Sequence, residues 1–201
     1  VKVWEKFDSN IVFDWENGNK EKVEKIFNEA DLISEVNLIN NRVVVNSMEP
    51  RGAIGEFDSS LNKYTLYTPS QNVHLMKTIV SGSLGIEPET LRVISPDMGG
   101  GFGMKVFIYP EQILVPYASK KINRTVKWTS DRSEAFISDT QGRDHITKAE
   151  IALDKNGKFR AIRVKTISNM GAYLSNFAPM IATHAGTVML TGLYDIPEAY
   201  V

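Results

Sequence analysis

Residues 90–105 read TLRVISPDMGGGFGMK, and they place four glycines and a lysine directly after a short strand. The pattern of Thr90–Ile94 predicts this strand, and Ser95-Pro96-Asp97 is expected to end it. Glycine has no Cβ and tolerates positive φ, so such a loop can present several backbone N–H groups to an anionic or oxo-bearing ligand. We interpret residues 99–105 as a ligand-binding loop, with a tight structural turn as the alternative.

The loop does not have the spacing of the common phosphate-binding motifs. A P-loop has glycine directly before its lysine and Ser or Thr after it, where this chain has Met104 and Val106. A dinucleotide fingerprint needs a third glycine where Met104 stands. A small phosphate- or nucleotide-binding module that uses the loop as an anion nest, and a scaffold domain without a ligand, remain alternative functions.

The sequence around the loop mixes strands and helices without strict βαβ alternation. Residues 53–58 and 63–68 predict a hairpin, and residues 19–31 predict an amphipathic helix. Ser70 is expected to cap a helix that ends at Gly82 and Gly85. A further helix begins at Pro110, and Pro116 is expected to kink or break it. The class predicted is α+β, with mixed sheets and packed helices.

The clearest predicted hairpin joins residues 146–153 and 159–167 around Asp154-Lys155-Asn156-Gly157, because Asn-Gly is a strong turn signal. One face of this hairpin is expected to be buried, and it carries Ala149, Ile151, Leu153, Ile162 and Val164. The other is expected to face water, and it carries Lys148, Glu150, Arg163 and Lys165.

Composition excludes several classes of function. The net charge is −1, with 23 basic and 24 acidic residues, and no basic stripe suits a nucleic acid. The absence of cysteine excludes disulfides and cluster ligands within these residues and fits the cytoplasm. No apolar run is long enough for a membrane span. The three histidines lie far apart, so we expect no metal ligands here, and Ser81-Gly82-Ser83-Leu84-Gly85 does not match a nucleophile elbow.

Three further features stand out. Gln71 opens a predicted helix, and its neutral amide can donate to an oxo or carbonyl oxygen; a polar residue at a helix start is the alternative. Phe102 either fills the core beneath the loop or stacks beside a ligand. Met48-Glu49-Pro50-Arg51 is interpreted as a turn with a structural ion pair.

These pieces occur in an order that resembles one family. The order begins with residues 48–52, 67–72 and 98–105 and continues through residues 124–132, 142–145, 168–173 and 192–197. Together they resemble the molybdopterin-binding large subunit of the molybdenum hydroxylases, the xanthine dehydrogenase and aldehyde oxidase family. Val106 stands where purine-oxidising members have Glu, which disfavours a purine substrate. Residues 106–110 are most similar to the carbon monoxide dehydrogenase large-chain branch.

The resemblance implies residue roles. Gln71 matches the glutamine whose amide hydrogen-bonds an oxo ligand of molybdenum. Gly100, Gly101, Phe102 and Gly103 match the loop whose backbone lies against the molybdenum–dithiolene end of the cofactor. The implied enzyme is a molybdopterin-dependent oxidoreductase that hydroxylates an aldehyde or heterocycle, or oxidises CO, with water-derived oxygen. FAD and two-iron two-sulfur clusters are implied on partner subunits or domains.

Both ends of the chain suggest a piece of a longer protein, since it begins at Val1 without methionine and stops at Val201. We expect residues 1–201 to be the first part of the molybdopterin-binding domain, with possible sub-lobes 1–123 and 124–201. The family's general base and active-site loop are expected outside these residues. No catalytic residue is therefore assigned here, and the chain alone is expected to be inactive and unable to retain cofactor.

Overall fold

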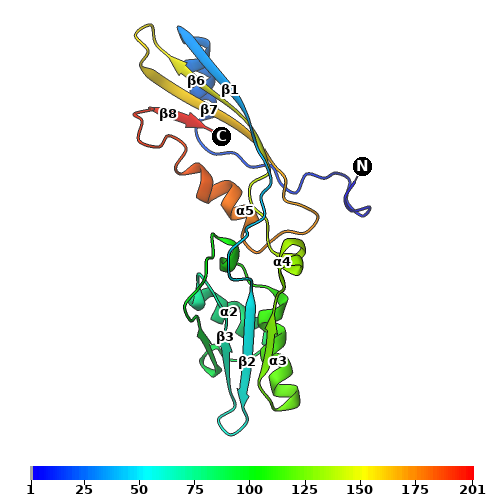
Figure 1. Cartoon of the computed structure of the whole chain (residues 1–201). Helices are drawn as coiled ribbons and strands as arrows, with labels where there is room; N and C mark the ends of the chain where they lie inside the picture. Colours follow the sequence, from blue (N-terminus) through cyan, green and yellow to red (C-terminus); the bar gives the residue numbers. More distant parts are fainter. Residues whose placement is uncertain (1) are drawn as a thin grey trace. The chain divides into compact units, whose positions relative to one another are not determined.

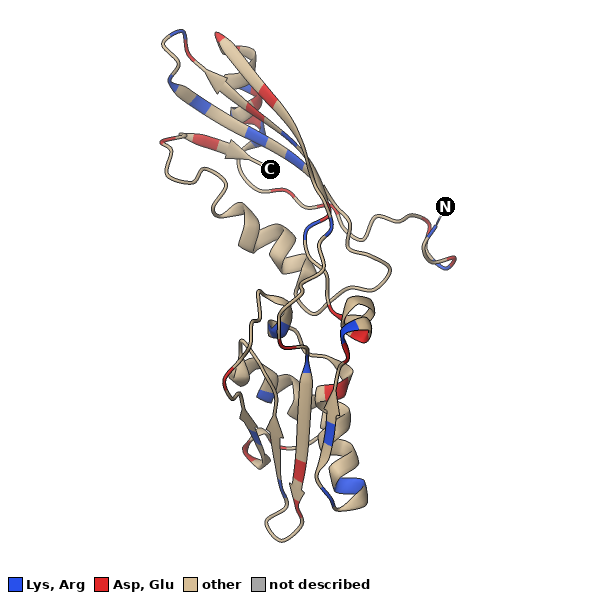
Figure 2. Ribbon diagram, in the orientation of Figure 1, with Lys and Arg blue, Asp and Glu red and all other residues tan. Residues whose placement is uncertain are grey.

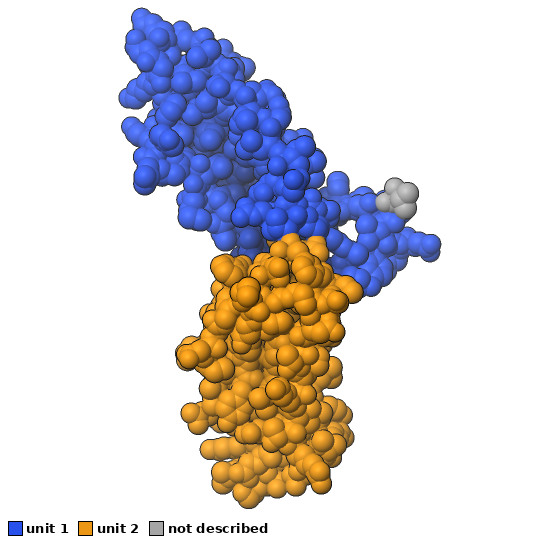
Figure 3. Space-filling view, in the orientation of Figure 1, with its two compact units in different colours: residues 1–43, 143–201 blue, residues 44–142 orange. Residues whose placement is uncertain are grey.

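The computed structural model describes residues 2–201, which form two compact units (Figures 1 and 3). Residues 1–43 and 143–201 form unit 1, of which Val1 is not described, and residues 44–142 form unit 2. This division differs from the sub-lobes 1–123 and 124–201 expected from the sequence. The reason is strand pairing, because β1 (Leu32–Asn40) pairs with β6 (His145–Leu153), more than a hundred residues later in the chain.

Unit 1 is built on a four-stranded sheet of order β1-β6-β7-β8. Its strands are β1 (Leu32–Asn40), β6 (His145–Leu153), β7 (Phe159–Ser168) and β8 (Glu198–Tyr200). The β1/β6 and β6/β7 pairs are antiparallel and β7/β8 is parallel. The helical segments of this unit are α1 (Lys20–Asn28), α5 (Ala178–Met180) and a π-helical turn over Ile181–Ala185. The predicted hairpin of residues 146–167 is therefore confirmed.

Helix α1 packs on the face of this sheet that was expected to face water. Val23 and Phe27 of α1 form a buried cluster with Ala152 and Ala161, which lie opposite each other on β6 and β7. Arg163 lies on the same face, with its guanidinium 4.1 Å from the centre of the Phe27 ring. The small alanines make room for the helix, so this face is covered where α1 packs, contrary to the expectation, while Lys148 and Lys165 on the same face are exposed as expected. Figure 2 shows charged residues along these strands.

Unit 2 has a second four-stranded sheet, of order β4-β3-β2-β5. Its strands are β2 (Gly52–Asp58), β3 (Lys63–Tyr67), β4 (Leu91–Ile94) and β5 (Val126–Thr129). Its helices are α2 (Val73–Leu84), α3 (Pro110–Ile122) and α4 (Arg132–Ser138), with 3₁₀ turns at Pro88–Thr90 and Met104–Val106. Strands β2 and β3 form the predicted hairpin, and β3 and β4 pair in parallel through α2. The two mixed sheets with packed helices confirm the predicted α+β class.

The core of unit 2 lies between the sheet and helices α2 and α3. Leu66, Met76 and Val80 have no exposed surface, and the fully buried Pro116 belongs to α3. Helix α3 runs unbroken through Pro116, contrary to the expected break. At Gly55 of β2, a Cβ would lie 2.5 Å from the Pro116 nitrogen. This close approach of helix to strand leaves no room for a side chain and stabilises the helix through packing.

The N-cap of helix α2 lies two residues later than expected. Asn72 is the N-cap, and its Oδ1 accepts a hydrogen bond from Leu75 N at 3.0 Å. Ser70 instead accepts from Asn72 N at 3.1 Å and so shapes the turn that leads into the helix. The helix ends at Gly85, which is left-handed with φ 65°. Gln71 therefore lies just before the helix rather than in its first turn.

Candidate functional site

The glycine loop lies in unit 2, between β4 and α3, and its backbone needs glycine at two positions. Gly100 has φ 99° and Gly103 has φ 86°, both in the left-handed range where other residues are strained. Phe102 lies between them with φ 49°, an uncommon value for a residue with a side chain. Phe102 is 78 % exposed, so it does not fill the core beneath the loop.

Gln71 and the loop are in direct contact. Gly103 N donates to Gln71 Oε1 at 2.9 Å, and Gln71 N donates to Lys105 O at 3.1 Å. A Cβ on Gly101 would lie 2.7 Å from Gln71 Cδ, so glycine there allows the carboxamide to lie against the backbone. The structure thus brings the predicted site residues Gln71, Gly101 and Gly103 together, and Gly100 and Phe102 lie between or beside them in the same loop.

Several donors at this place have no partner. Among residues 2–201, the amide N–H groups of Gly100, Gly101 and Phe102 donate no hydrogen bond, and neither does Gln71 Nε2. The Gln71 carboxamide is oriented by its oxygen, so its NH₂ group is left to donate elsewhere. Neutral, fixed donors of this kind suit an anionic or oxo oxygen.

Two supporting residues were not singled out from the sequence as part of the site. Lys105 is 1 % exposed, and its Nζ donates to Glu49 Oε2 and to Glu49 O, each at 2.8 Å. Glu49 Oε2 also accepts from Gly99 N at 2.9 Å. The sequence signal was present, since Glu49 falls in the segment interpreted as a turn with a structural ion pair. Its partner across 56 residues was not visible.

The base of the loop rests on Tyr109 and Arg51. Tyr109 Oη donates to Met104 O at 3.0 Å, and burial raises the pKa of Tyr109, which keeps the phenol a neutral donor. Arg51 lies over the Tyr109 ring, with its guanidinium carbon 3.8 Å from the ring centre. It pairs with Asp139 at 2.6 Å and with Glu111 at 2.8 Å. Burial lowers the pKa of Arg51, but these carboxylates outweigh it, so the net shift is upward.

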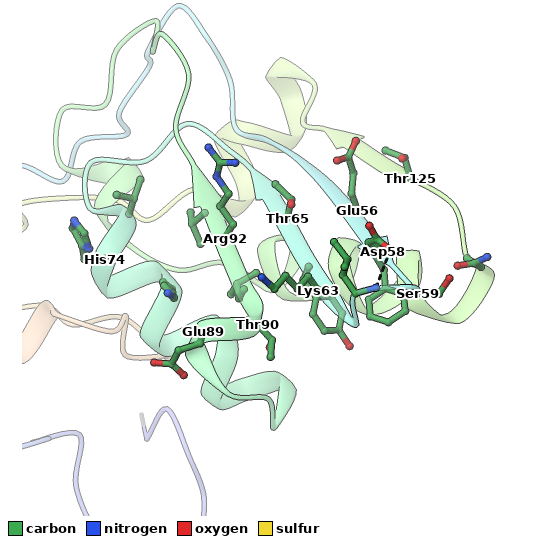
Figure 4. A pocket seen from close by; sticks show the side chains of 18 residues that line it. Glu56, Asp58, Ser59, Lys63, Thr65, His74, Glu89, Thr90, Arg92 and Thr125 are labelled. Atoms are coloured by element: carbon green, nitrogen blue, oxygen red, sulfur yellow. Dashed lines mark hydrogen bonds between the residues drawn. The ribbon is translucent and has the colours of Figure 1, made fainter.

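A separate hollow of about 1000 Å³ lies elsewhere in unit 2 (Figure 4). Its lining includes the charged residues Glu56, Asp58, Lys63 and Arg92, and it contains neither Gln71 nor any residue of the glycine loop. Charges of both signs are mixed there. Within the described residues no group of three or more His, Cys, Asp or Glu side chains could hold a metal ion. The hollow therefore offers no defined chemistry.

Comparison with known proteins places this geometry in a family. Residues 3–201 match the family described as the molybdopterin cofactor-binding domain. The chain is 33 % identical over 191 residues to the carbon monoxide dehydrogenase large chain of Hydrogenophaga pseudoflava, covering 95 % of this chain and 24 % of that one. It is 31 % identical over 179 residues to the nicotine 6-hydroxylase large subunit of Paenarthrobacter nicotinovorans, covering 88 % of this chain and 22 % of that subunit.

A solved structure agrees with these relatives. The quinoline 2-oxidoreductase of Pseudomonas putida 86 superposes with a TM-score of 0.86 at 26 % identity, covering all of this chain and 25 % of that one. The chain therefore spans about a quarter of the length of the proteins it matches. Because the family match extends over almost every residue, the chain belongs to the molybdopterin cofactor-binding domain family of the molybdenum hydroxylases.

Proposed function

We propose that this chain is the first part of the molybdopterin-binding domain of a longer molybdenum hydroxylase large subunit. The whole protein would be an oxidoreductase that hydroxylates an aldehyde or heterocycle, or oxidises CO, with oxygen derived from water. The observation that carries the proposal is the contact between Gln71 and the glycine loop. It groups a carboxamide NH₂ with three backbone amides, none of which has a hydrogen-bond partner among residues 2–201.

The residues present fit the molybdenum–pterin group. Gln71 Nε2 would donate to an oxo ligand, and the backbone of Gly100, Gly101, Phe102 and Gly103 would hold the metal–dithiolene end. When bound, the group supplies two-electron oxidation and activates water-derived oxygen. The chain's own residues bind and orient it. No charged side chain of the loop competes, because Lys105 is buried against Glu49.

That burial of Lys105 also weighs against the phosphate-binding alternative. A loop that holds phosphate gains much of its affinity from a lysine or arginine that reaches the anion. Here the loop's single lysine has its Nζ engaged by Glu49 through two hydrogen bonds. The amides alone form a neutral site, which suits a metal-bound oxo group better than a free phosphate.

Partner subunits complete the proposed enzyme. Relatives of this chain are named as a large chain or a large subunit, so other subunits accompany them. We propose that subunits or domains carrying FAD and two-iron two-sulfur clusters accept the electrons, and that the assembly is cytoplasmic. Among the described residues no helix is long and apolar enough to cross a membrane.

The test is to purify the natural polypeptide that contains these residues and to measure molybdenum and pterin. We expect about one molybdenum per polypeptide, and dye-linked oxidation of at least one member of a panel of aldehydes, N-heterocycles and CO. Gln71→Ala should lower the metal content or the rate. A wild-type polypeptide that carries neither molybdenum nor pterin would refute the proposal. The 201-residue chain alone is expected to hold no molybdenum.

A further inference from the structure

The glycine loop is closed on itself by one carboxylate. Glu49 Oε2 receives hydrogen bonds from both ends of the loop, from Gly99 N at 2.9 Å and from Lys105 Nζ at 2.8 Å. The backbone of Glu49 repeats the connection, since its N donates to Gly99 O at 3.1 Å and its O accepts from Lys105 Nζ at 2.8 Å. Four hydrogen bonds therefore join the two ends of residues 99–105 through a single residue.

The backbone of Glu49 is itself held in place. Ser47 is buried, and its Oγ donates to Glu49 O at 2.7 Å, the same oxygen that accepts from Lys105. A Cβ on Gly99 would lie 2.6 Å from Glu49 Cβ, so only glycine lets the loop start this close to the carboxylate. The contact is thus a packed one rather than a loose surface pair. Charge-assisted hydrogen bonds to a lysine buried from solvent are stronger than exposed ion pairs.

The loop needs such support because its free conformation is unfavourable. Phe102 holds a left-handed backbone, and three consecutive amides, at 100, 101 and 102, have no hydrogen-bond partner among the described residues. A left-handed backbone is strained for a residue with a side chain, and the surroundings must offset that strain. Without a tie at its ends, a glycine-rich segment would sample many other conformations.

We infer that Glu49 and Lys105 form a latch whose task is to hold the glycine loop in its binding conformation. They are positioning residues, and neither is a ligand of the bound group. The inference rests on the proposed function only for what the loop binds. What it says about the conformation of the loop can be measured in the chain without any cofactor. The inference predicts that a substitution in the latch makes residues 99–105 mobile while the rest of unit 2 stays folded.

Amide hydrogen exchange of the full chain without cofactor tests this directly. Lys105→Met keeps the apolar stem and removes the donors, and Glu49→Ala removes the shared carboxylate, whose side chain is 37 % exposed. We expect exchange of the hydrogen-bonded amides of the loop, Gly103 N on Gln71 Oε1 and Met104 N on Gly101 O, to rise about tenfold or more in both variants, in line with the loss of a charged hydrogen bond. Glu49→Gln keeps an acceptor for Gly99 N and should give a smaller rise.

Val80→Ala is the matched control. Val80 lies on α2, has no exposed surface and packs in the core of unit 2, so its truncation lowers stability without touching the latch. We expect its melting temperature to fall while loop exchange stays within twofold of wild type. Loop exchange within twofold of wild type in Glu49→Ala overturns the inference, even if Lys105→Met does not fold. So does an equal rise in Val80→Ala at a matched loss of stability.

A second measurement separates this inference from the proposed function. In the natural longer polypeptide, Lys105→Met should lower the molybdenum content at least severalfold at unchanged expression. If the wild-type polypeptide contains no molybdenum while the exchange results hold, the function is wrong and the latch is right. If molybdenum is present and loop exchange does not respond, the latch is wrong and the function stands.

Discussion

Substituting Gly101 by alanine tests the contact on which the site depends. The new Cβ would lie 2.7 Å from Gln71 Cδ and Oε1 and 2.9 Å from Cγ, all closer than real contacts allow. The φ of Gly101 is outside the left-handed range, so alanine is not strained by its own backbone. The three nearest atoms all belong to the exposed side chain of Gln71, so we expect Gln71 to swing aside rather than the loop to unfold.

The cost follows from what Gln71 loses. Its Oε1 gives up the 2.9 Å hydrogen bond from Gly103 N, worth about 1 kcal/mol, and the displaced side chain adds up to about 1 kcal/mol of rotamer strain. The total of about 1–2 kcal/mol corresponds to a fall in melting temperature of roughly 2–8 °C for a chain of this size. Thermal and urea unfolding of the full chain measure this change.

A double-mutant cycle isolates the contact. Gln71→Ala alone should cost about 1 kcal/mol, and Gly101→Ala in that background should cost less than about 0.5 kcal/mol, because the obstructing atoms are gone. Gly82→Ala is the control, since a Cβ there meets nothing within 4 Å and should stabilise α2 by about 0.5–1 kcal/mol. An undiminished cost of Gly101→Ala in the Gln71→Ala chain would refute the reasoning.

Three further substitutions probe the rest of the chain. Gly55→Ala should destabilise unit 2 by about 2 kcal/mol or more in denaturant unfolding, because its Cβ would lie 2.5 Å from the backbone of Pro116, which cannot swing away. Arg51→Met should cost about 3–5 kcal/mol, since it leaves the Asp139 carboxylate buried without its partner, and adding Asp139→Asn should recover part of the loss in a melting experiment. Hydrogen bonds from backbone amides, chiefly that of Lys158, lower the pKa of Asp154. The stabilisation by its carboxylate is therefore present at neutral pH and is lost as the pH falls below about 4, through the folded-state pKa. The stability difference between wild type and Asp154→Asn should vanish over that range, and a constant difference would contradict the prediction.

Local sequence signals predicted most elements of the fold. The turn at Asp154–Gly157 and the alternation around it indicated the second hairpin, and the stripe of Val23 and Phe27 indicated helix α1. Both signals depend on neighbours a few residues apart. The α+β class followed in the same way. The same local view misplaced the cap of α2 by two residues, because Ser70 and Asn72 are both good caps.

The candidate site was likewise predictable from the sequence only in part. From residue types alone, four glycines after a strand indicated a ligand-binding loop or a tight turn, and Gln71 a ligand donor or a polar residue at a helix start. The resemblance to one family implied that the two share a site, and the structure shows their contact. The support beneath the loop was out of reach of sequence reasoning. Glu49 and Lys105 are 56 residues apart, and a charged residue in a sequence gives no sign of whether it is solvated or buried.

The amino-acid sequence by itself determined the local chain conformations, the glycine loop and the resemblance to one family, since these depend on residue type and spacing. Only the tertiary structure decided which sheet face receives α1, where each compact unit begins and ends, and which carboxylate neutralises Lys105. Those outcomes depend on fitting distant surfaces together. Ala152 and Ala161, weakly apolar in the sequence, become the site of helix packing because their small side chains let α1 approach.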